Sequence, residues 1–134
     1  MKRGLTTTQK AGIALAALLY IAAGVAHFLY PEPFRGIVPP YLPWPTQLVM
    51  ISGVCEILGG LGLLFPPTRR LAAWGLVALL IAVFPANIYM ATNPVEAGAS
   101  SIAPILRWGR LPLQFVLGWW VLRCTQPQTS IKSV

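Results

Sequence analysis

Long apolar stretches, separated by short polar or proline-rich segments, fill most of the 134-residue chain. Three of them, residues 11–29, 48–65 and 71–91, are close to the ~20 residues that a helix needs to cross a bilayer. A fourth, residues 111–122, reaches this length only if its helix begins near residues 104–105. Backbone in lipid must satisfy its own hydrogen bonds, so each crossing is expected to be a helix. The pattern predicts an all-α membrane protein, an antiparallel bundle of four transmembrane helices.

We expect a single domain over residues 1–134, because the chain contains no soluble module, low-complexity tail or clear repeat. The helices are predicted at about residues 10–29, 47–65, 71–91 and 105–123. Six prolines in residues 30–46 predict a stiff loop after the first helix, since proline restricts φ. Residues 66–70 predict a tight turn, which makes the second and third helices antiparallel neighbours.

Basic residues stand at the ends of the apolar stretches and give the chain a net charge of +7. Nucleic-acid binding is not favoured, because the cations do not gather on one soluble face. One side of the predicted bundle carries Lys2, Arg3, Lys10, Arg69, Arg70, Arg123 and Lys132. The other side carries Arg35, Arg107 and Arg110, with Arg107 and Arg110 expected to snorkel outward. The positive-inside rule then predicts that both termini are cytoplasmic.

The first apolar stretch has some features of a signal peptide. Lys2 and Arg3 precede it, and small residues occur at its end. The stretch is long for the apolar region of a signal peptide, however, and cleavage would remove one wall of the bundle. We therefore interpret it as a helix that remains in the membrane.

Each apolar stretch contains one conspicuous polar side chain: His27, Glu56, Asn87 and Gln114. With a rise of ~1.5 Å per residue, antiparallel threading places all four in the outer half of the membrane. Arg110, one turn above Gln114, can reach the same region. Polar groups in hydrocarbon are costly and usually face the bundle interior. The sequence thus predicts a polar pocket that opens outward.

Glu56 is the only acid inside a predicted crossing, and an isolated carboxylate there must be protonated or paired. The candidate partners are His27 and Arg110. In one interpretation Glu56 and His27 form a proton-exchanging pair that lines a ligand pocket. In the other, Glu56 only hydrogen-bonds neighbouring helices together.

The remaining polar residues suggest binding rather than metal chemistry. The chain has one histidine, which is a poor ligand set for a metal or haem, so no metal site and no intrinsic cofactor are expected. Asn87 and Gln114 do not titrate and are more typical of helix-joining hydrogen bonds. Tyr89, near Asn87, is a candidate to line a flat apolar ligand such as a quinone.

A stand-alone enzyme is not favoured. The chain has no HExxH motif, phosphate-binding glycine loop or nucleophile elbow. Its two cysteines, Cys55 and Cys124, form no CxxC motif and suggest no disulfide within the chain. Thiol redox chemistry by this chain would require a partner.

Four motifs together resemble the DoxX/DoxD-like family of small four-helix membrane proteins. They are GVAHF at residues 24–28, SGVCEILGG at 52–60, FPANIYMA at 84–91 and RLPLQ at 110–114. The resemblance covers roughly residues 10–124 and implies a four-helix bundle in the bacterial inner membrane. Some relatives are linked with respiratory or thiosulfate-to-quinone electron transfer, and some with thiol and oxidative-stress proteins. A distant eukaryotic branch includes an assembly chaperone for ligand-gated receptors.

Three hypotheses of function follow. The leading one is an accessory subunit of a redox or quinone-linked system, whose outward-opening polar pocket binds a lipid-soluble molecule or docks a partner. The second is a non-catalytic scaffold or assembly factor. The third is a small proton-coupled transporter with Glu56 as the coupling acid, which would require a dimer. The expected partners are the lipid bilayer, a membrane or extracytoplasmic protein, and a second copy of the chain.

Overall fold

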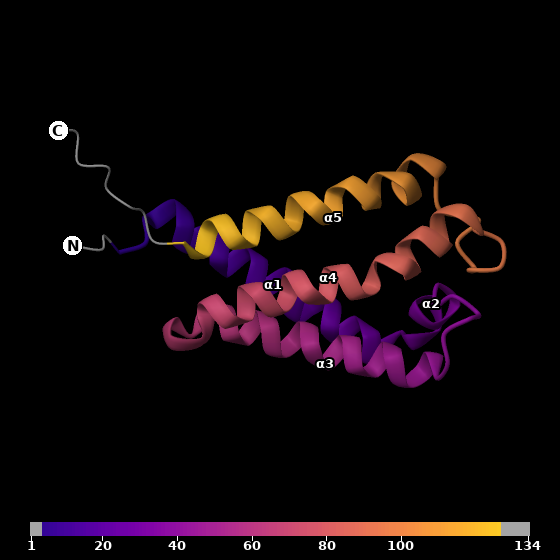
Figure 1. Ribbon diagram of the computed structural model, residues 1–134, viewed down its shortest axis with the longest axis horizontal. Helices are drawn as coiled ribbons and strands as arrows, with labels where there is room; N and C mark the ends of the chain where they lie inside the picture. Colours follow the sequence, from indigo (N-terminus) through magenta and orange to yellow (C-terminus); the bar gives the residue numbers. More distant parts are fainter. Residues whose placement is uncertain (1–3, 127–134) are drawn as a thin grey trace.

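The computed structural model describes residues 4–126, and this part of the chain contains helices, turns and loops but no strand. The elements are α1 (Thr7–Leu29), α2 (Pro31–Gly36), α3 (Pro45–Leu64), the 3-10 turn η1 (Pro66–Thr68), α4 (Arg69–Thr92) and α5 (Pro104–Thr125). The long helices lie side by side in an elongated body (Figure 1). Both α1 and α4 contact α3 and α5. The prediction of an all-α protein is confirmed.

Three segments are long and apolar enough to cross a membrane: Thr7–Leu29, Pro45–Leu64 and Pro66–Thr92. They correspond to α1, α3 and η1 with α4, and they agree with the first three predicted crossings. Helix α5 has 22 residues, but it falls outside this group. Its first half contains Arg107, Arg110 and Gln114, which lower its average hydropathy.

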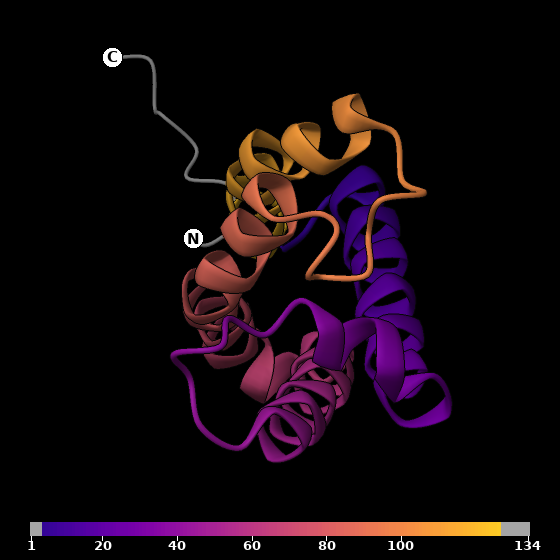
Figure 2. The same ribbon diagram turned by 90° about the vertical axis from the view of Figure 1, so that its right-hand side faces the viewer.

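The two ends of the molecule are built differently. At one end, the terminal end, lie the start of α1, the end of α5 and η1 (Figure 1). The other end, the loop end, is covered by α2 and by the loop formed by residues 93–103 (Figure 2). The site described below lies toward the loop end.

Local hydrogen bonds explain where the helices begin and turn at the terminal end. Thr6 and Gln9 form a capping box at the start of α1, with each side chain bonded to the other's backbone N–H. The hydroxyl of Thr68 donates to the carbonyl of Gly62, and Nε of Arg69 donates to that of Leu63 at 2.7 Å. These bonds satisfy the free carbonyls at the end of α3 and so stabilise the tight turn into α4.

The segment predicted as a loop, residues 30–46, contains the short helix α2. Pro31 occupies its first turn, where the missing N–H of proline costs nothing. An ion pair of 2.7 Å between Arg35 and Glu32 connects neighbouring turns of this exposed helix. The prediction of an entirely non-helical loop was wrong, because prolines that end one helix are also compatible with starting the next.

Small and apolar side chains fill the terminal end. A core cluster of residues from α1, α3, α4 and α5 includes Ala16, Ala17, Leu63, Leu76 and Val121. Leu63, Leu76 and Val121 are at most 1% exposed. This half of the molecule is therefore densely packed around its axis.

Glycines bring α1 and α3 into close contact nearer the loop end. A Cβ atom added to Gly24 would lie 2.6 Å from the backbone oxygen of Gly53, and one added to Gly53 would lie 2.9 Å from Cβ of His27. Only glycine permits such an approach of two helix backbones. The contact places His27 of α1 against the part of α3 that carries Glu56.

Large apolar side chains cover the outside of the helices. Leu18, Leu29, Leu58, Ile81 and Phe115 are all more than 60% exposed. A soluble monomer seldom exposes so much apolar surface, whereas a helix in lipid does so by default. The distribution of side chains agrees with the spans found from length and hydropathy.

Candidate functional site

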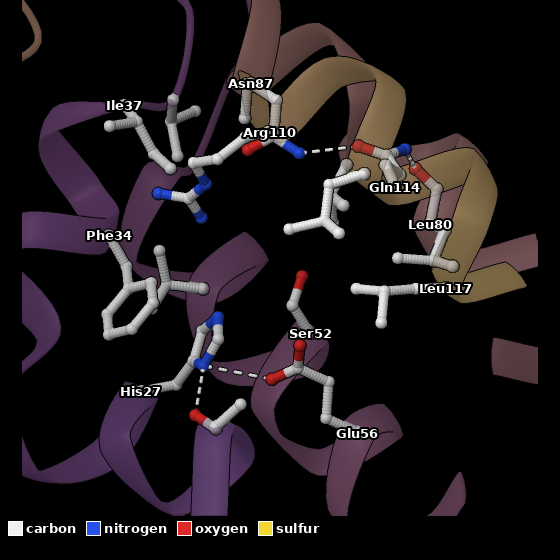
Figure 3. A pocket seen from close by; sticks show the side chains of 16 residues that line it. His27, Phe34, Ile37, Ser52, Glu56, Leu80, Asn87, Arg110, Gln114 and Leu117 are labelled. Carbon is white, nitrogen blue, oxygen red and sulfur yellow. Dashed lines mark hydrogen bonds and ion pairs between the residues drawn. The ribbon is translucent and has the colours of Figure 1, made fainter. Parts of the chain in front are cut away.

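A cavity of about 240 Å³ lies between the long helices toward the loop end. Residues of α1, α3, α4 and α5 form its walls, and α2 with the turn after it supplies three more lining residues (Figure 3). It is lined by Ala23, His27, Phe34, Ile37, Val38, Val49, Ser52, Glu56, Leu80, Val83, Ala86, Asn87, Arg110, Leu113, Gln114 and Leu117. Five of the six residues predicted for the polar pocket thus surround one space.

His27 and Glu56 form the polar wall made by α1 and α3. Nδ1 of His27 lies 2.7 Å from the carbonyl oxygen of Ala23 and 3.1 Å from Oε2 of Glu56. A carbonyl oxygen only accepts, so Nδ1 carries a hydrogen atom and Nε2 is the ring nitrogen that faces the cavity (Figure 3). The expected pairing of Glu56 with His27 is present in the structure.

The second oxygen of Glu56 extends toward the cavity beside Ser52 (Figure 3). Oε2 itself is buried and has no hydrogen bond of good geometry among the described residues, although it lies at ion-pair distance from His27. The Glu56 carboxyl group therefore has unused capacity to accept hydrogen bonds. Such capacity in a low-dielectric setting is costly unless a further donor fills it.

Phe34 fixes the orientation of the His27 ring. The two rings are stacked with their centroids 3.8 Å apart and their planes at 20°. Phe34 comes from α2, so this short helix forms part of the cavity wall. The sequence analysis missed Phe34, because no periodicity in the proline-rich segment shows which way the chain turns.

Ser52 was also missed as a lining residue. It lies four residues before Glu56 on α3, and this spacing places both on one face of the helix. That signal was available in the sequence.

Arg110 is the cationic side chain of the opposite wall. Its guanidinium group extends toward the side of the cavity that holds His27 and Phe34 (Figure 3). Its one polar contact within residues 4–126 is weak, from Nη1 to Sδ of Met90 at 3.5 Å. Arg110 was the other predicted partner of Glu56, but the two ion pairs found in residues 4–126 are His27 with Glu56 and Arg35 with Glu32.

Asn87 and Gln114 join α4 to α5. Nε2 of Gln114 donates a hydrogen bond to the carbonyl of Leu80, and its Oε1 accepts one of 2.6 Å from Nδ2 of Asn87. Because the Leu80 carbonyl requires a donor, these bonds also fix which amide atom of Gln114 is nitrogen. The arrangement agrees with the interpretation of both amides as helix-joining groups, while Oδ1 of Asn87 remains free to face the cavity.

Tyr89 does not line the cavity. It packs against the small core cluster of Met90, Ala97 and Ala99, which supports the loop of residues 93–103. Tyr89 follows Asn87 by two positions, and this spacing rotates it to another face of α4. The hypothesis that Tyr89 contacts a ligand in this pocket has no support in the geometry.

Arg107 was expected to snorkel outward, and this prediction was wrong. The side chain is 9% exposed, and its Nη1 donates to the carbonyls of Ala99 at 3.2 Å and Ile102 at 3.0 Å. A loop carbonyl has two lone pairs and no partner within a helix, so it can accept a strong charge-assisted bond from a guanidinium group. Arg107 thus binds the loop of residues 93–103 to the start of α5.

The described residues contain no group of three or more histidine, cysteine or acidic side chains placed to hold a metal ion. Cys55 and Cys124 are both free thiols, Cys55 exposed and Cys124 buried. The cavity accordingly offers hydrogen-bonding and charged groups. What these groups can do is bind and orient a small polar group or exchange a proton with it.

Three apolar helices of membrane-spanning length, together with a polar cavity beside a fourth helix, define a small helical membrane protein. More particularly, the chain belongs to a family that is described as Domain of unknown function (DUF8561), whose model matches residues 15–125. The match includes every residue that lines the cavity. No curated protein and no solved structure matches the chain significantly.

Proposed function

We propose that this protein is an inner-membrane binding protein whose cavity holds the polar head of a lipid-soluble molecule, as an accessory subunit of a larger membrane system. One observation carries the proposal: a cavity between apolar helices is lined by Glu56, His27 and Arg110, whose polar groups are not all hydrogen-bonded within residues 4–126. Intramembrane ionisable groups usually mark function. A redox or quinone-linked system is the candidate that the DoxX-like motifs suggest.

The proposal includes α5 as a fourth crossing of an antiparallel bundle. A 22-residue helix is about 33 Å long, enough for the hydrocarbon core. Arg107 and Gln114 are directed away from lipid, because Arg107 bonds the loop and Gln114 bonds α4. Leu113, Phe115, Val116 and Trp119 are exposed. A helix with a polar inner face and an apolar outer face crosses lipid despite a low average hydropathy.

The orientation proposed for the bundle follows from its cations. The terminal end contains Lys10, Arg69, Arg70 and Arg123, so it is placed in the cytoplasm. The loop end, with α2 and residues 93–103, then faces the outside of a bacterial inner membrane. In this orientation the cavity is reached from the outer side.

The test is native mass spectrometry of the full chain extracted gently from its own membrane, with analysis of the lipids that co-purify. We expect a retained small molecule that is lost in Glu56→Gln and in His27→Ala. Arg35→Gln is the matched control, because Arg35 belongs to the same end of the molecule but does not line the cavity. Equal retention in all variants would refute a binding role for the cavity.

A scaffold or assembly factor is the second candidate. A groove of about 380 Å³ on the outer face of α3 and α4 is lined by Cys55, Leu58, Gly59, Gly62, Thr68, Leu71, Ala72 and Gly75. Small residues let another helix approach closely in lipid. A stoichiometric protein partner, retained in mild detergent and unaffected by Glu56→Gln, would favour this function over ligand binding.

A further inference from the structure

We propose that the cavity selects a zwitterionic head group, with the anionic end at Arg110 and a primary ammonium end at Glu56 and Ser52. This inference rests on the proposed binding function and names its ligand class. The shared chemistry is a phosphate or carboxylate joined to an ammonium group by a few atoms. An aminophospholipid and a small free zwitterion are its two sources.

The pairing of acidic with basic side chains is the first support for this ligand class. The whole sequence contains three acidic residues. Glu32 pairs with Arg35 and Glu56 lies beside His27, while Glu96 is exposed in the loop of residues 93–103. Arg110 therefore has no acid within ion-pair distance in the described part of the chain. Arg110 is an exposed residue that lines the cavity, and a guanidinium group without a counter-ion attracts an anionic ligand.

Arg110 and Arg107 differ in the hydrogen-bond partners of their guanidinium groups, although they lie one turn apart on α5. Nη1 of Arg107 is bonded to two loop carbonyls, and Arg107 does not line the cavity. Among the described residues, the guanidinium group of Arg110 reaches only a methionine sulfur, a weak acceptor. A planar guanidinium group presents paired N–H donors that match the oxygens of phosphate or carboxylate. Arg110 is thus available for an anion, and Arg107 is not.

The opposite wall has the complementary chemistry. Oε2 of Glu56 is buried without a hydrogen bond of good geometry, and the other carboxyl oxygen and Ser52 face the cavity. The carboxylate oxygens require donors, and the Ser52 hydroxyl can accept a further hydrogen bond. An ammonium group supplies three, and its positive charge compensates the carboxylate. A ligand with acceptors at both ends, such as an oxidised quinone, satisfies the Arg110 wall but not the carboxylate wall.

Size sets a further limit. A cavity of 150 Å³ accommodates benzene, so one of about 240 Å³ holds roughly ten non-hydrogen atoms. A phosphoethanolamine group has about eight, on the same scale. The cavity therefore fits a head group and not the acyl chains attached to it, which must remain in the surrounding bilayer.

The experiment measures retention of defined probes by the full chain in detergent with native mass spectrometry. The probes are short-chain phosphatidylethanolamine, which is zwitterionic, and short-chain phosphatidylglycerol, which has the phosphate without the amine. We expect phosphatidylethanolamine to bind more tightly than phosphatidylglycerol. Arg110→Gln should weaken its binding about 10- to 100-fold, the loss typical of a charge-assisted hydrogen-bond pair. Glu56→Gln should abolish the preference for the amine.

Arg35→Gln serves as the matched control and should bind like the wild type. Arg110→Lys keeps the charge but not the paired donors, so binding between that of the wild type and that of Arg110→Gln is expected. Circular dichroism on heating verifies that each variant is folded. Glycerophosphoethanolamine, which has no acyl chains, identifies the source. If it displaces the lipid, a free zwitterion is the ligand; if it does not, the ligand is the lipid, and both results agree with the proposed class.

Three results would overturn the inference. Equal or tighter binding of phosphatidylglycerol would exclude the ammonium end. If all variants bind phosphatidylethanolamine with the same affinity, the lipid is adsorbed on the outer surface and not bound in the cavity. Retention of a quinone or another neutral molecule from the native membrane, sensitive to Glu56→Gln, would refute the zwitterion but keep the binding function. If neither a native molecule nor any probe is retained, both proposals fail.

Discussion

Gln114 connects two helices through a short series of hydrogen bonds. It donates to the carbonyl of Leu80 and accepts from Asn87, so removal of the Gln114 amide takes the interhelical partner away from both groups. In hydrocarbon there is no water to replace the lost bonds. Measured interhelical hydrogen bonds in membranes are nevertheless modest, about 0.6 kcal/mol on average and up to about 2 kcal/mol.

Replacement of Gln114 by leucine should therefore lower the free energy of unfolding by about 1 kcal/mol. The measurement is a denaturant titration in detergent, followed by circular dichroism. Gln47→Leu is the control, because Gln47 is an exposed amide on α3. The double variant Asn87→Leu with Gln114→Leu should lose less than the sum of the single losses, since both remove one bond. Strict additivity would mean that the two amides do not interact.

Arg107 is the second residue with a specific structural consequence. It bonds the carbonyls of Ala99 and Ile102 and so restrains the loop of residues 93–103. Arg107→Gln should increase hydrogen exchange in this loop at least several-fold, since loss of a charge-assisted bond costs roughly 1.5–3 kcal/mol. Mass spectrometry of exchanged peptides measures the effect. Arg110→Gln should leave exchange in the loop unchanged, and a similar increase in both variants would refute the specific role of Arg107.

At the residue scale, depth could be predicted from the sequence but direction could not. Counting along each apolar stretch placed His27 and Glu56 in the same half of the bundle, because the helical rise is constant. Whether a side chain faces a neighbour depends on rotation about the helix axis and on contacts with distant residues. For this reason Tyr89 was wrongly included among the residues of the pocket. The inward orientation of Arg107 depends on loop carbonyls, whose position no local sequence pattern reveals.

Helices α1 and α3 approach each other through glycine. Gly24 has no room for a Cβ atom, which would lie 2.6 Å from a backbone oxygen of α3. A backbone atom cannot rotate away as a side chain can, so the helices must separate to accept a methyl group. Separation would also lengthen the 3.1 Å contact between His27 and Glu56.

Gly24→Ala should therefore destabilise the protein by about 1–3 kcal/mol, the usual cost of overpacking. The melting temperature in detergent measures this effect. Gly75→Ala is the matched control on α4, because a Cβ atom there would meet nothing within 4 Å. That variant should be neutral or slightly stabilised, since alanine is the better helix former. Equal melting temperatures for the two variants would contradict the close packing of α1 on α3.

At the element scale, the long helices were predictable because apolar composition is a local property that extends over about twenty residues. The predicted helix at residues 47–65 corresponds to Pro45–Leu64, and the one at residues 71–91 to Arg69–Thr92. The short helix α2 was not predictable in the same way. Its stability depends on Phe34 stacking against His27 of another helix, which is a tertiary contact.

For the whole molecule, the number of crossings fixes the location of the C-terminus. With three crossings the C-terminus lies opposite the N-terminus, and with four it returns to the same side. We expect a fluorescent protein fused to the C-terminus to fold and fluoresce in the cytoplasm. In a variant that lacks Cys55, we expect a cysteine introduced by Glu96→Cys to react with a membrane-impermeant reagent added from outside. If the fusion is not fluorescent while the Glu96→Cys variant is labelled from outside, the chain crosses the membrane three times and α5 lies outside the membrane core.

The dense packing of the terminal end makes the cavity a blind pocket. Leu63, Leu76 and Val121, all nearly inaccessible, close the axis below it. In the proposed orientation, protons and solutes exchange between Glu56 and the outer compartment, while the cytoplasm is sealed off by hydrocarbon. The carboxyl group would then respond to the acidity outside the cell and remain insensitive to the cytoplasmic pH. A protein of this form can bind molecules from the outer side without opening a leak for protons or ions across the membrane.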